Sequence, residues 1–266
     1  MKKVTYIVPV HEFNDEIKTY ATNALTSLVH LKGAEEAEIL LVGEVEVITK
    51  FQTLFNEICG EDNKQSIVLF PTNEQDLFEK INAAVAKCTT PYFSLLEFDD
   101  AFYPYWDEVA QRYLNNYEFS IVMPITEIVT PEGQIGGFAN EIAWDAAFVG
   151  EDSLGFVKLS DLLIFRDFIP SGSYIKVSDF LELGGLKPEL KIAAWYEYLL
   201  NTANSGKQIF VTPRIGYKHT VLRETSYMTV TTNTLTREEG VALIQQAMEP
   251  YVEKENKNDA GAGDEK

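Results

Sequence analysis

Short apolar runs alternate with longer amphipathic segments through the first hundred residues. The apolar runs predict strands at residues 4–10, 38–42, 66–70 and 92–96. Between them, apolar residues recur at helical spacing. They predict helices from a cap at Asn14 or Asp15 to about residue 31, over 45–58, and around Leu77, Ile81, Ala84 and Val85. A strand–helix alternation of this kind predicts a parallel, doubly wound sheet with right-handed crossovers.

The pattern is less regular after residue 100. It predicts helices at 103–117 and 190–203, strands at 120–125, 168–177, 208–212 and 215–220, and a hairpin formed by residues 134–139 after a turn at 130–133. Ser178 or Asp179 is expected to cap a short helix that ends at Gly184-Gly185, and residues 140–155 give no clear pattern. Thr236 should cap a last helix that ends near residue 255, with Pro250 as a candidate break, before a disordered tail at 255–266.

Composition sets limits on what the chain binds. Its 266 residues are 45% hydrophobic, which is enough for one sizeable core, and the formal net charge is −19. Such an acidic chain is not expected to bind nucleic acid or anionic lipid directly, because both require contacts from lysine and arginine. Neither a run of transmembrane length nor a signal peptide is recognisable, so the expectation is a cytoplasmic protein without a disulfide between Cys59 and Cys88.

An acidic cluster directly follows the fourth predicted strand. Glu97, Asp99 and Asp100 come after the apolar run that ends at Leu96, and ligands of open α/β sheets bind at the carboxyl ends of strands. Three adjacent acids repel one another, and a hard divalent cation would offset their charge. The alternative is a solvated turn, or Asp100 as the cap of a following helix.

The stretch around this cluster resembles a known motif. Asn82, Val85, Cys88 and Tyr92, followed by Leu96-Glu97-Phe98-Asp99-Asp100, stand in the register of the core motif of family-2 glycosyltransferases, which have the GT-A fold. Glu97 replaces the first aspartate of that motif. Ile81 stands where the family often has arginine, and Lys80 lies one position earlier.

The resemblance implies a fold, an activity and a site. It implies a GT-A-like domain over residues 1–220 with a mixed, mainly parallel sheet flanked by helices. Residues 1–100 would form the nucleotide-binding half and 101–220 the acceptor half, and 221–254 would add a loop and a C-terminal helix. The implied reaction is transfer of a sugar from a nucleoside diphosphate sugar, with a UDP-sugar favoured, to a hydroxyl acceptor. It would be assisted by Mg²⁺ or Mn²⁺ and would invert the anomeric centre.

Site residues follow from the same resemblance. Those implied for the metal are Glu97, Asp99, Asp100 and His219. Those implied for the nucleotide are Pro9, His11, Glu44, Asn82, Lys218 and Arg223. The last two, with His219, also offer the positive charge that a diphosphate needs.

The sequence differs from the family pattern at the position of the general base. The family carries Glu-Asp near the start of the helix that follows its acceptor-side motif, which residues 173–186 resemble, and Ala194 and Trp195 occupy those positions here. Glu197, on the same helix, is the substitute candidate, against an ordinary solvated residue.

Two other readings remain open. One is a catalytically degenerate GT-A fold that serves as a structural or binding module for a protein partner. The other is a nucleotidyltransferase, but residues 11–13 do not supply the glycine-rich, basic loop that such enzymes carry after their first strand.

Overall fold

The computed structural model describes residues 3–59, 63–141, 154–166 and 168–261, with side chains up to residue 252 in the last helix. Its first half alternates strand and helix as predicted. These elements are β1 (Val4–Pro9), α1 (Asp15–Val29), β2 (Glu38–Gly43), α2 (Val45–Ile58), β3 (Ser66–Pro71), α3 (Leu77–Val85), β4 (Tyr92–Leu95), β5 (Ala101–Phe102) and α4 (Trp106–Leu114).

The second half mixes short strands and helices. Its elements are β6 (Ile121–Val129), β7 (Ile135–Ala139), β8 (Phe156–Val157), α5 (Leu159–Ile164), β9 (Tyr174–Lys176), α6 (Val177–Glu182), the 3₁₀ helix η3 (Pro188–Ala193), α7 (Ala194–Asn204), β10 (Ile209–Thr220), α8 (Tyr227–Thr234) and α9 (Arg237–Gly261).

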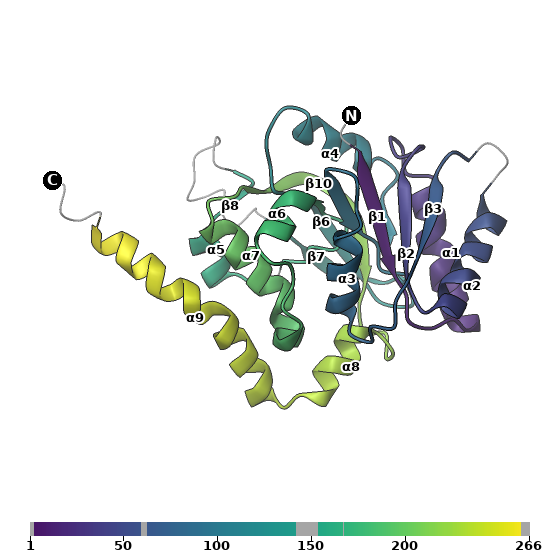
Figure 1. Cartoon of the computed structure of the whole chain (residues 1–266). Coiled ribbons are helices and arrows are strands. Elements are labelled where there is room, and N and C mark those ends of the chain that lie inside the picture. The colour runs from purple at the N-terminus through teal and green to yellow at the C-terminus, as the bar shows by residue number, and fades with distance from the viewer. Residues whose placement is uncertain (1–2, 60–62, 142–153, 167, 262–266) are drawn as a thin grey trace.

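All described strands join one mixed sheet (Figure 1). The order is β3-β2-β1-β4-β9-β6-β10-β5, with β7 beside β6 and β8 beside β10. The pairs β1–β2, β2–β3, β1–β4 and β6–β10 are parallel, whereas β9 and β5 run antiparallel to their neighbours. This is the mixed, mainly parallel sheet that the sequence predicted.

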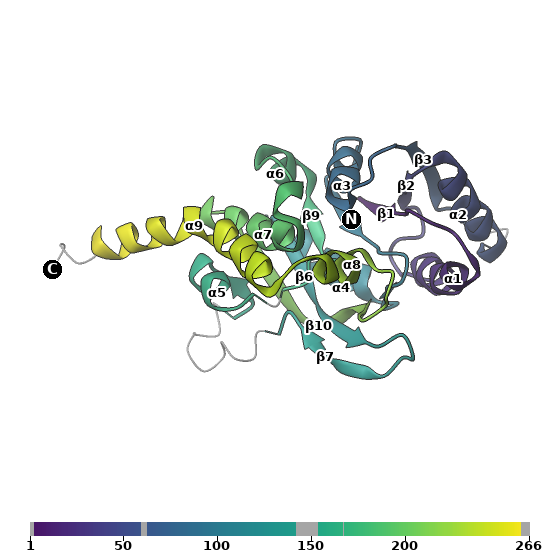
Figure 2. The ribbon, with the colours of Figure 1, turned by 90° about the horizontal axis from the view of Figure 1, so that it is seen from below.

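Helices cover both faces of the sheet (Figures 1 and 2). One core contains Tyr6 and Val8 of β1 with the apolar faces of α1, α2 and α4, and the other contains Ile7 of β1 with α3, α6, α7 and α9. Alternate residues of β1 therefore face opposite cores, as expected for a strand buried on both sides. In the described part of the chain, no helix combines the length and the apolar character needed to cross a membrane.

Several predicted boundaries were wrong for identifiable reasons. The strand predicted at 168–177 is limited to β9, because α6 already begins at Val177; Lys176, rather than Ser178 or Asp179, precedes that helix. The helix predicted at 190–203 begins instead in η3, which Lys191 interrupts with a φ of +46°, and only α7 from Ala194 onward is a regular α-helix. The two strands predicted at 208–212 and 215–220 are one strand, β10, with register shifts near Pro213, which has no N–H to donate.

The C-terminal region also differs from the prediction. The sequence predicted a loop where α8 lies. Thr236 and Glu239 form the expected reciprocal capping bonds of α9. This helix then passes Pro250 and continues to Gly261, so the predicted end near residue 255 was wrong; its last turns project away from the domain (Figure 1). Residues 262–266 of the predicted tail, and most of 140–155, lie outside the described residues.

A close backbone approach at the end of β2 requires glycine. A Cβ on Gly43 would lie 2.4 Å from the carbonyl oxygen of Val10. We expect Gly43→Ala to lower the free energy of unfolding by about 1–3 kcal/mol through overpacking. Gly136→Ala, whose Cβ would meet no atom closer than 3.7 Å, should change it by less than about 0.5 kcal/mol. Urea denaturation curves test this, and equal midpoints for the two variants would contradict it.

Candidate metal and nucleotide site

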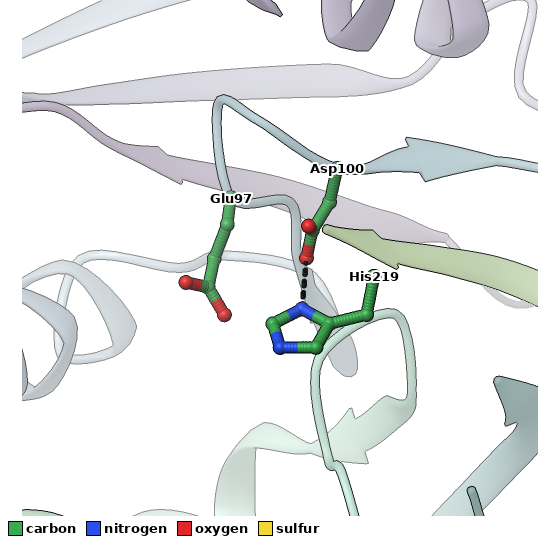
Figure 3. A group of neighbouring side chains, drawn as sticks. All are labelled: Glu97, Asp100 and His219. Atoms are coloured by element: carbon green, nitrogen blue, oxygen red, sulfur yellow. Dashed lines mark hydrogen bonds and ion pairs between the residues drawn. The ribbon is translucent and has the colours of Figure 1, made fainter. Parts of the chain in front are cut away.

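The acidic cluster lies where β4 ends and is completed by β10. The backbone N–H of Asp100 donates to the carbonyl of Glu97 at 3.1 Å, and this turn brings both carboxylates to one side. Antiparallel pairing of β5 with β10 places His219 beside them. One ligand atom each from Glu97, Asp100 and His219 lie within 4.8 Å of one another (Figure 3), so three groups able to bind a metal converge.

Each member of this group is held by a further contact. His219 Nδ1 lies 2.9 Å from Asp100 Oδ2, and the other oxygen of Asp100 accepts the backbone N–H of Thr220 at 2.8 Å. Glu97 Oε1 accepts the hydroxyl of Ser171 at 2.7 Å. Asp100 is 2% exposed and is followed by β5, so the alternative of a solvated turn or helix cap is wrong.

Burial and the neighbouring charges shift the pKa values of Glu97 and His219. Burial, and then the negative charge of Asp100, raise the pKa of Glu97 to about 7. Burial alone would lower the pKa of His219, but Asp100, Glu97 and Asp99 outweigh it and raise that pKa to about 10. The imidazole therefore carries a proton at neutral pH and supplies one of the positive charges that the acids need.

The donor set suits a divalent metal. Two carboxylate oxygens and an imidazole nitrogen are ligands that Mn²⁺ accepts, whereas Mg²⁺ prefers oxygen alone. The bonds from Ser171 and the Thr220 N–H hold the two carboxylates, as outer-shell partners of metal ligands do. The residues present therefore fit a metal, which would replace the proton of His219.

Asp99 lies outside this group of three. Its Oδ2 accepts Arg223 Nε at 2.8 Å, and both side chains are nearly fully buried. Burial and then Asp100 raise the pKa of Asp99, while Arg223 opposes that rise. Two residues that the sequence assigned to the metal and to the nucleotide are thus bound to each other.

A cavity of about 420 Å³ lies at the carboxyl end of β1. The residues that line it are Pro9, Val10, His11, Glu12, Gln75, Leu77, Lys80, Thr225, Tyr227, Val230 and Thr231. Pro9 and His11 lie here, where the sequence placed a nucleotide. A cavity of about 440 Å³ at the amino ends of β1 and β2 contains none of the predicted site residues, and we attach no function to it.

Lys80 is the lining residue that the sequence analysis missed. It is 4% exposed, and within the described residues no hydrogen bond or ion pair to its side chain is present. Burial lowers the pKa of Lys80, against the opposing charges of Glu44 and Asp76. The missed signal was a lysine on the apolar face of an amphipathic helix, three residues after Leu77 and four before Ala84.

Three predicted nucleotide-binding residues do not line this cavity. Asn82 does not line the cavity, because its amide group bonds both the N–H and the carbonyl of Leu186. Glu44 precedes α2 and accepts Gln75 Nε2 at 3.4 Å. Lys218 neighbours His219 on β10, so its side chain points to the other face, where it lies 3.6 Å from Glu127.

Glu197 is buried, and among the described residues its polar contacts do not include the acidic cluster. It is 1% exposed, and its Oε1 lies 2.5 Å from both Lys187 Nζ and the hydroxyl of Tyr251 in α9. The burial contradicts a solvated helix position, and the contacts tie α9 to α7. A role as general base would require Glu197 to leave Lys187 and Tyr251.

Solved structures share this fold, although no family model and no curated protein matches the chain. S. aureus TarS 1–349 in complex with UDP-GlcNAc superposes with a TM-score of 0.67 at 16% identity, over 92% of this chain and 65% of that one. The complex of TarS 1–349 with UDP gives 0.61 at 14% identity, over 92% and 70%. The mannosyltransferase PcManGT from Pyrobaculum calidifontis, in complex with GDP-Man and Mn²⁺, gives 0.58 at 14% identity, over 84% and 58%.

These comparisons define the fold class. The chain has the GT-A fold of glycosyltransferases, which confirms the fold that the sequence predicted. It spans less than two thirds of TarS 1–349 in the UDP-GlcNAc complex and 37% of a longer TarS chain.

The charge of His219 leads to a pH prediction for the metal-free protein. Because its folded-state pKa is about 10 against 6.5 for a free histidine, its contribution to stability is complete below pH 6.5 and is lost as the pH rises toward 10. NMR titration should show the His219 ring protonated at pH 8. In Asp100→Asn the midpoint should fall by about 1–3 pH units.

His11 is the internal control for this titration. Burial lowers its pKa, so its ring should be neutral at pH 8 in both proteins. A His219 midpoint near 6.5 in the unsubstituted protein would contradict the ion pair with Asp100.

Proposed function

We propose that this protein transfers a sugar from a nucleoside diphosphate sugar to a hydroxyl acceptor with the help of Mn²⁺ or Mg²⁺. The observation that carries the proposal is the convergence of Glu97, Asp100 and His219 at the carboxyl end of β4, the end of a strand at which open α/β sheets bind ligands. TarS structures hold UDP-GlcNAc or UDP, and the PcManGT structure holds GDP-Man and Mn²⁺, which supports a nucleotide-sugar donor here and favours a uridine nucleotide.

The chain's own residues divide the work of donor binding. Glu97, Asp100 and His219 would hold the metal, which supplies positive charge to the departing diphosphate. Pro9, His11 and the Lys80 ammonium would receive the nucleoside in the cavity at the end of β1. Lys80 offers three N–H donors and no acceptor, so it matches the carbonyl oxygens of uracil. A single displacement on this donor would invert the anomeric centre.

Metal-dependent nucleotide binding tests the proposal. Calorimetric titration with UDP should show binding that strengthens with Mn²⁺. Asp100→Asn and His219→Gln should each weaken this binding about 10-fold or more, because even outer-shell substitutions at metal sites cost that much. Glu127→Gln is the matched control, since this acid lies in β6 and contacts Tyr103 and Lys218 instead of the acidic cluster.

The result that would reject the donor site is equally specific. The donor site is contradicted if UDP affinity does not depend on Mn²⁺. It is also contradicted if Glu127→Gln weakens UDP binding as much as Asp100→Asn does. GDP and CDP in the same titration test the choice of base.

Lys80 gives a second prediction, in which a substitution weakens UDP binding without lowering the stability of the fold. Lys80→Met should weaken UDP binding about 10–100-fold, the worth of a hydrogen bond from a charged group. It should not lower the melting temperature, because a buried cation without a partner destabilises the fold. Lys87→Met, an exposed site just after α3, should change neither quantity. Full UDP affinity in Lys80→Met would remove Lys80 from the site.

A degenerate binding module is the second candidate, and the contacts of Glu197 favour it. Ala194 and Trp195 cannot accept a proton, and the carboxylate of Glu197 is bound to Lys187 and Tyr251. Metal-dependent UDP binding without hydrolysis or transfer of any UDP-sugar in a screen of hydroxyl acceptors would select this candidate over the enzyme.

A further inference from the structure

The helix α8 covers the nucleotide cavity but has little intrinsic stability. Thr225, just before it, and Tyr227, Val230 and Thr231 within it line the cavity. None of its eight residues is buried, and its sequence, YMTVTTNT, is rich in β-branched residues that disfavour helix. Isolated helices of this length do not persist in water. The position of α8 therefore depends on a few contacts with the rest of the domain.

Among the described residues, α8 packs against η3 and Phe78, and two polar contacts, one from α8 and one from the segment before it, end on acids. The Tyr227 hydroxyl donates to Asp76 Oδ2 at 2.7 Å, and its ring packs on Phe78 with centroids 5.4 Å apart. Arg223, four residues earlier, pairs with Asp99 at 2.8 Å. Asp76 caps α3, which carries Lys80, and Asp99 adjoins the metal-binding group. The cover is thus attached at both edges of the cavity.

The pair of Arg223 and Asp99 is the stronger attachment. Their side chains are 3% and 6% exposed, so each charge depends on the other for its partner. The guanidinium also lies 4.8 Å from the ring centroid of Phe98 and donates to Thr225 Oγ1. Removing the charge of Arg223 leaves Asp99 buried beside Asp100 without its cation.

The segment before α8 has the geometry of a hinge under strain. Leu222 adopts φ +63°, which L-residues with a side chain rarely adopt, and it is 72% exposed, so no packing explains that conformation. It lies between two anchors in the acidic cluster: Thr220, bonded to Asp99 and Asp100, and Arg223, bonded to Asp99. Release of Arg223 would let this backbone relax.

We propose that the Arg223–Asp99 ion pair is a latch that keeps α8 folded over the nucleotide cavity, and that charge in the acidic cluster sets whether it is closed. A divalent cation bound by Glu97, Asp100 and His219 would add positive charge beside Asp99 and loosen its hold on Arg223. An anionic diphosphate in the cavity would then offer Arg223 a second partner and close the cover again. Only the identity of these ligands rests on the proposed function.

Hydrogen exchange without any ligand tests the latch. In Arg223→Gln, the amides of residues 227–234 should exchange about 10–100-fold faster than in the unsubstituted protein, because a buried ion pair no longer opposes local opening. Amides of β1 should keep their rates. The matched control is Lys207→Gln. It removes a lysine that pairs with Asp179 and Glu182, neither of which belongs to α8 or lines the cavity.

A second variant, Tyr227→Phe, covers the case in which Arg223→Gln does not fold. Tyr227→Phe removes only the hydroxyl bond to Asp76 and keeps the ring on Phe78, and it should speed exchange in the same residues to a smaller degree. Unchanged exchange of residues 227–234 in both variants, or the same change in Lys207→Gln, overturns the latch.

Addition of Mn²⁺ alone tests the coupling to charge. Exchange in α8 should accelerate in the unsubstituted protein and not in Asp100→Asn, and UDP added with Mn²⁺ should slow it again. No acceleration by Mn²⁺ overturns the coupling. If the latch exists but the protein binds no UDP, the variants should still speed exchange in residues 227–234, and only the slowing of exchange by UDP should be missing. Failure of the proposed function and failure of the latch therefore give different results.

Discussion

The rest of the site depends on the positive charge that three neighbouring carboxylates require. Glu97, Asp99 and Asp100 follow β4 directly, and their cations, His219 and Arg223, lie 119 and 124 residues further along the chain from the acids they pair with. The antiparallel pairing of β5 with β10 is what closes this distance. The C-terminal end of β10 therefore brings His219, and Arg223 just after the strand, to the end of another strand.

This long-range requirement explains which parts of the structure the sequence could predict. Elements up to β4 follow from local periodicity, because β1, β2 and β4 are apolar and almost entirely buried and α1 to α3 each bury one face. The edge strand β3 is only partly buried but has the same apolar run. Gly43, at the end of β2, has a structural reason that no local pattern shows, namely the close approach of the Val10 carbonyl. In contrast, α8 has poor helix propensity and depends on tertiary contacts, so no local pattern predicts it.

The same distinction applies to the candidate site. The acids were expected near a cation because they follow a strand, and His219 was expected there from the family resemblance. Of these residues, Glu97, Asp100 and His219 lie together in the structure. The pairing of Asp99 with Arg223 was not predictable, because both residues suit a ligand as well as each other, and only the fold decides which partner is nearer. Asn82 matched the family register and Glu197 was the substitute for the acid that the register lacks, yet Asn82 holds the backbone of Leu186 and Glu197 ties α9 to α7. Register gives position along an element, whereas function also requires the direction of the side chain.

Energetics separate two regions of the domain. Around the acidic cluster and the cavity at the end of β1, folding raises the pKa of Glu97 to about 7 and buries Lys80 without a hydrogen-bond or ion-pair partner among the described residues, and both features oppose stability. Groups that destabilise a fold are typical of ligand sites, where the ligand supplies the missing interactions. At α7, the carboxylate of Glu197 has Lys187 and Tyr251 as partners and serves packing of the C-terminal helix. The energetic signs of a ligand site are therefore concentrated around the acidic cluster and this cavity, and in the proposed reaction Glu197 could accept a proton only by leaving both of its partners.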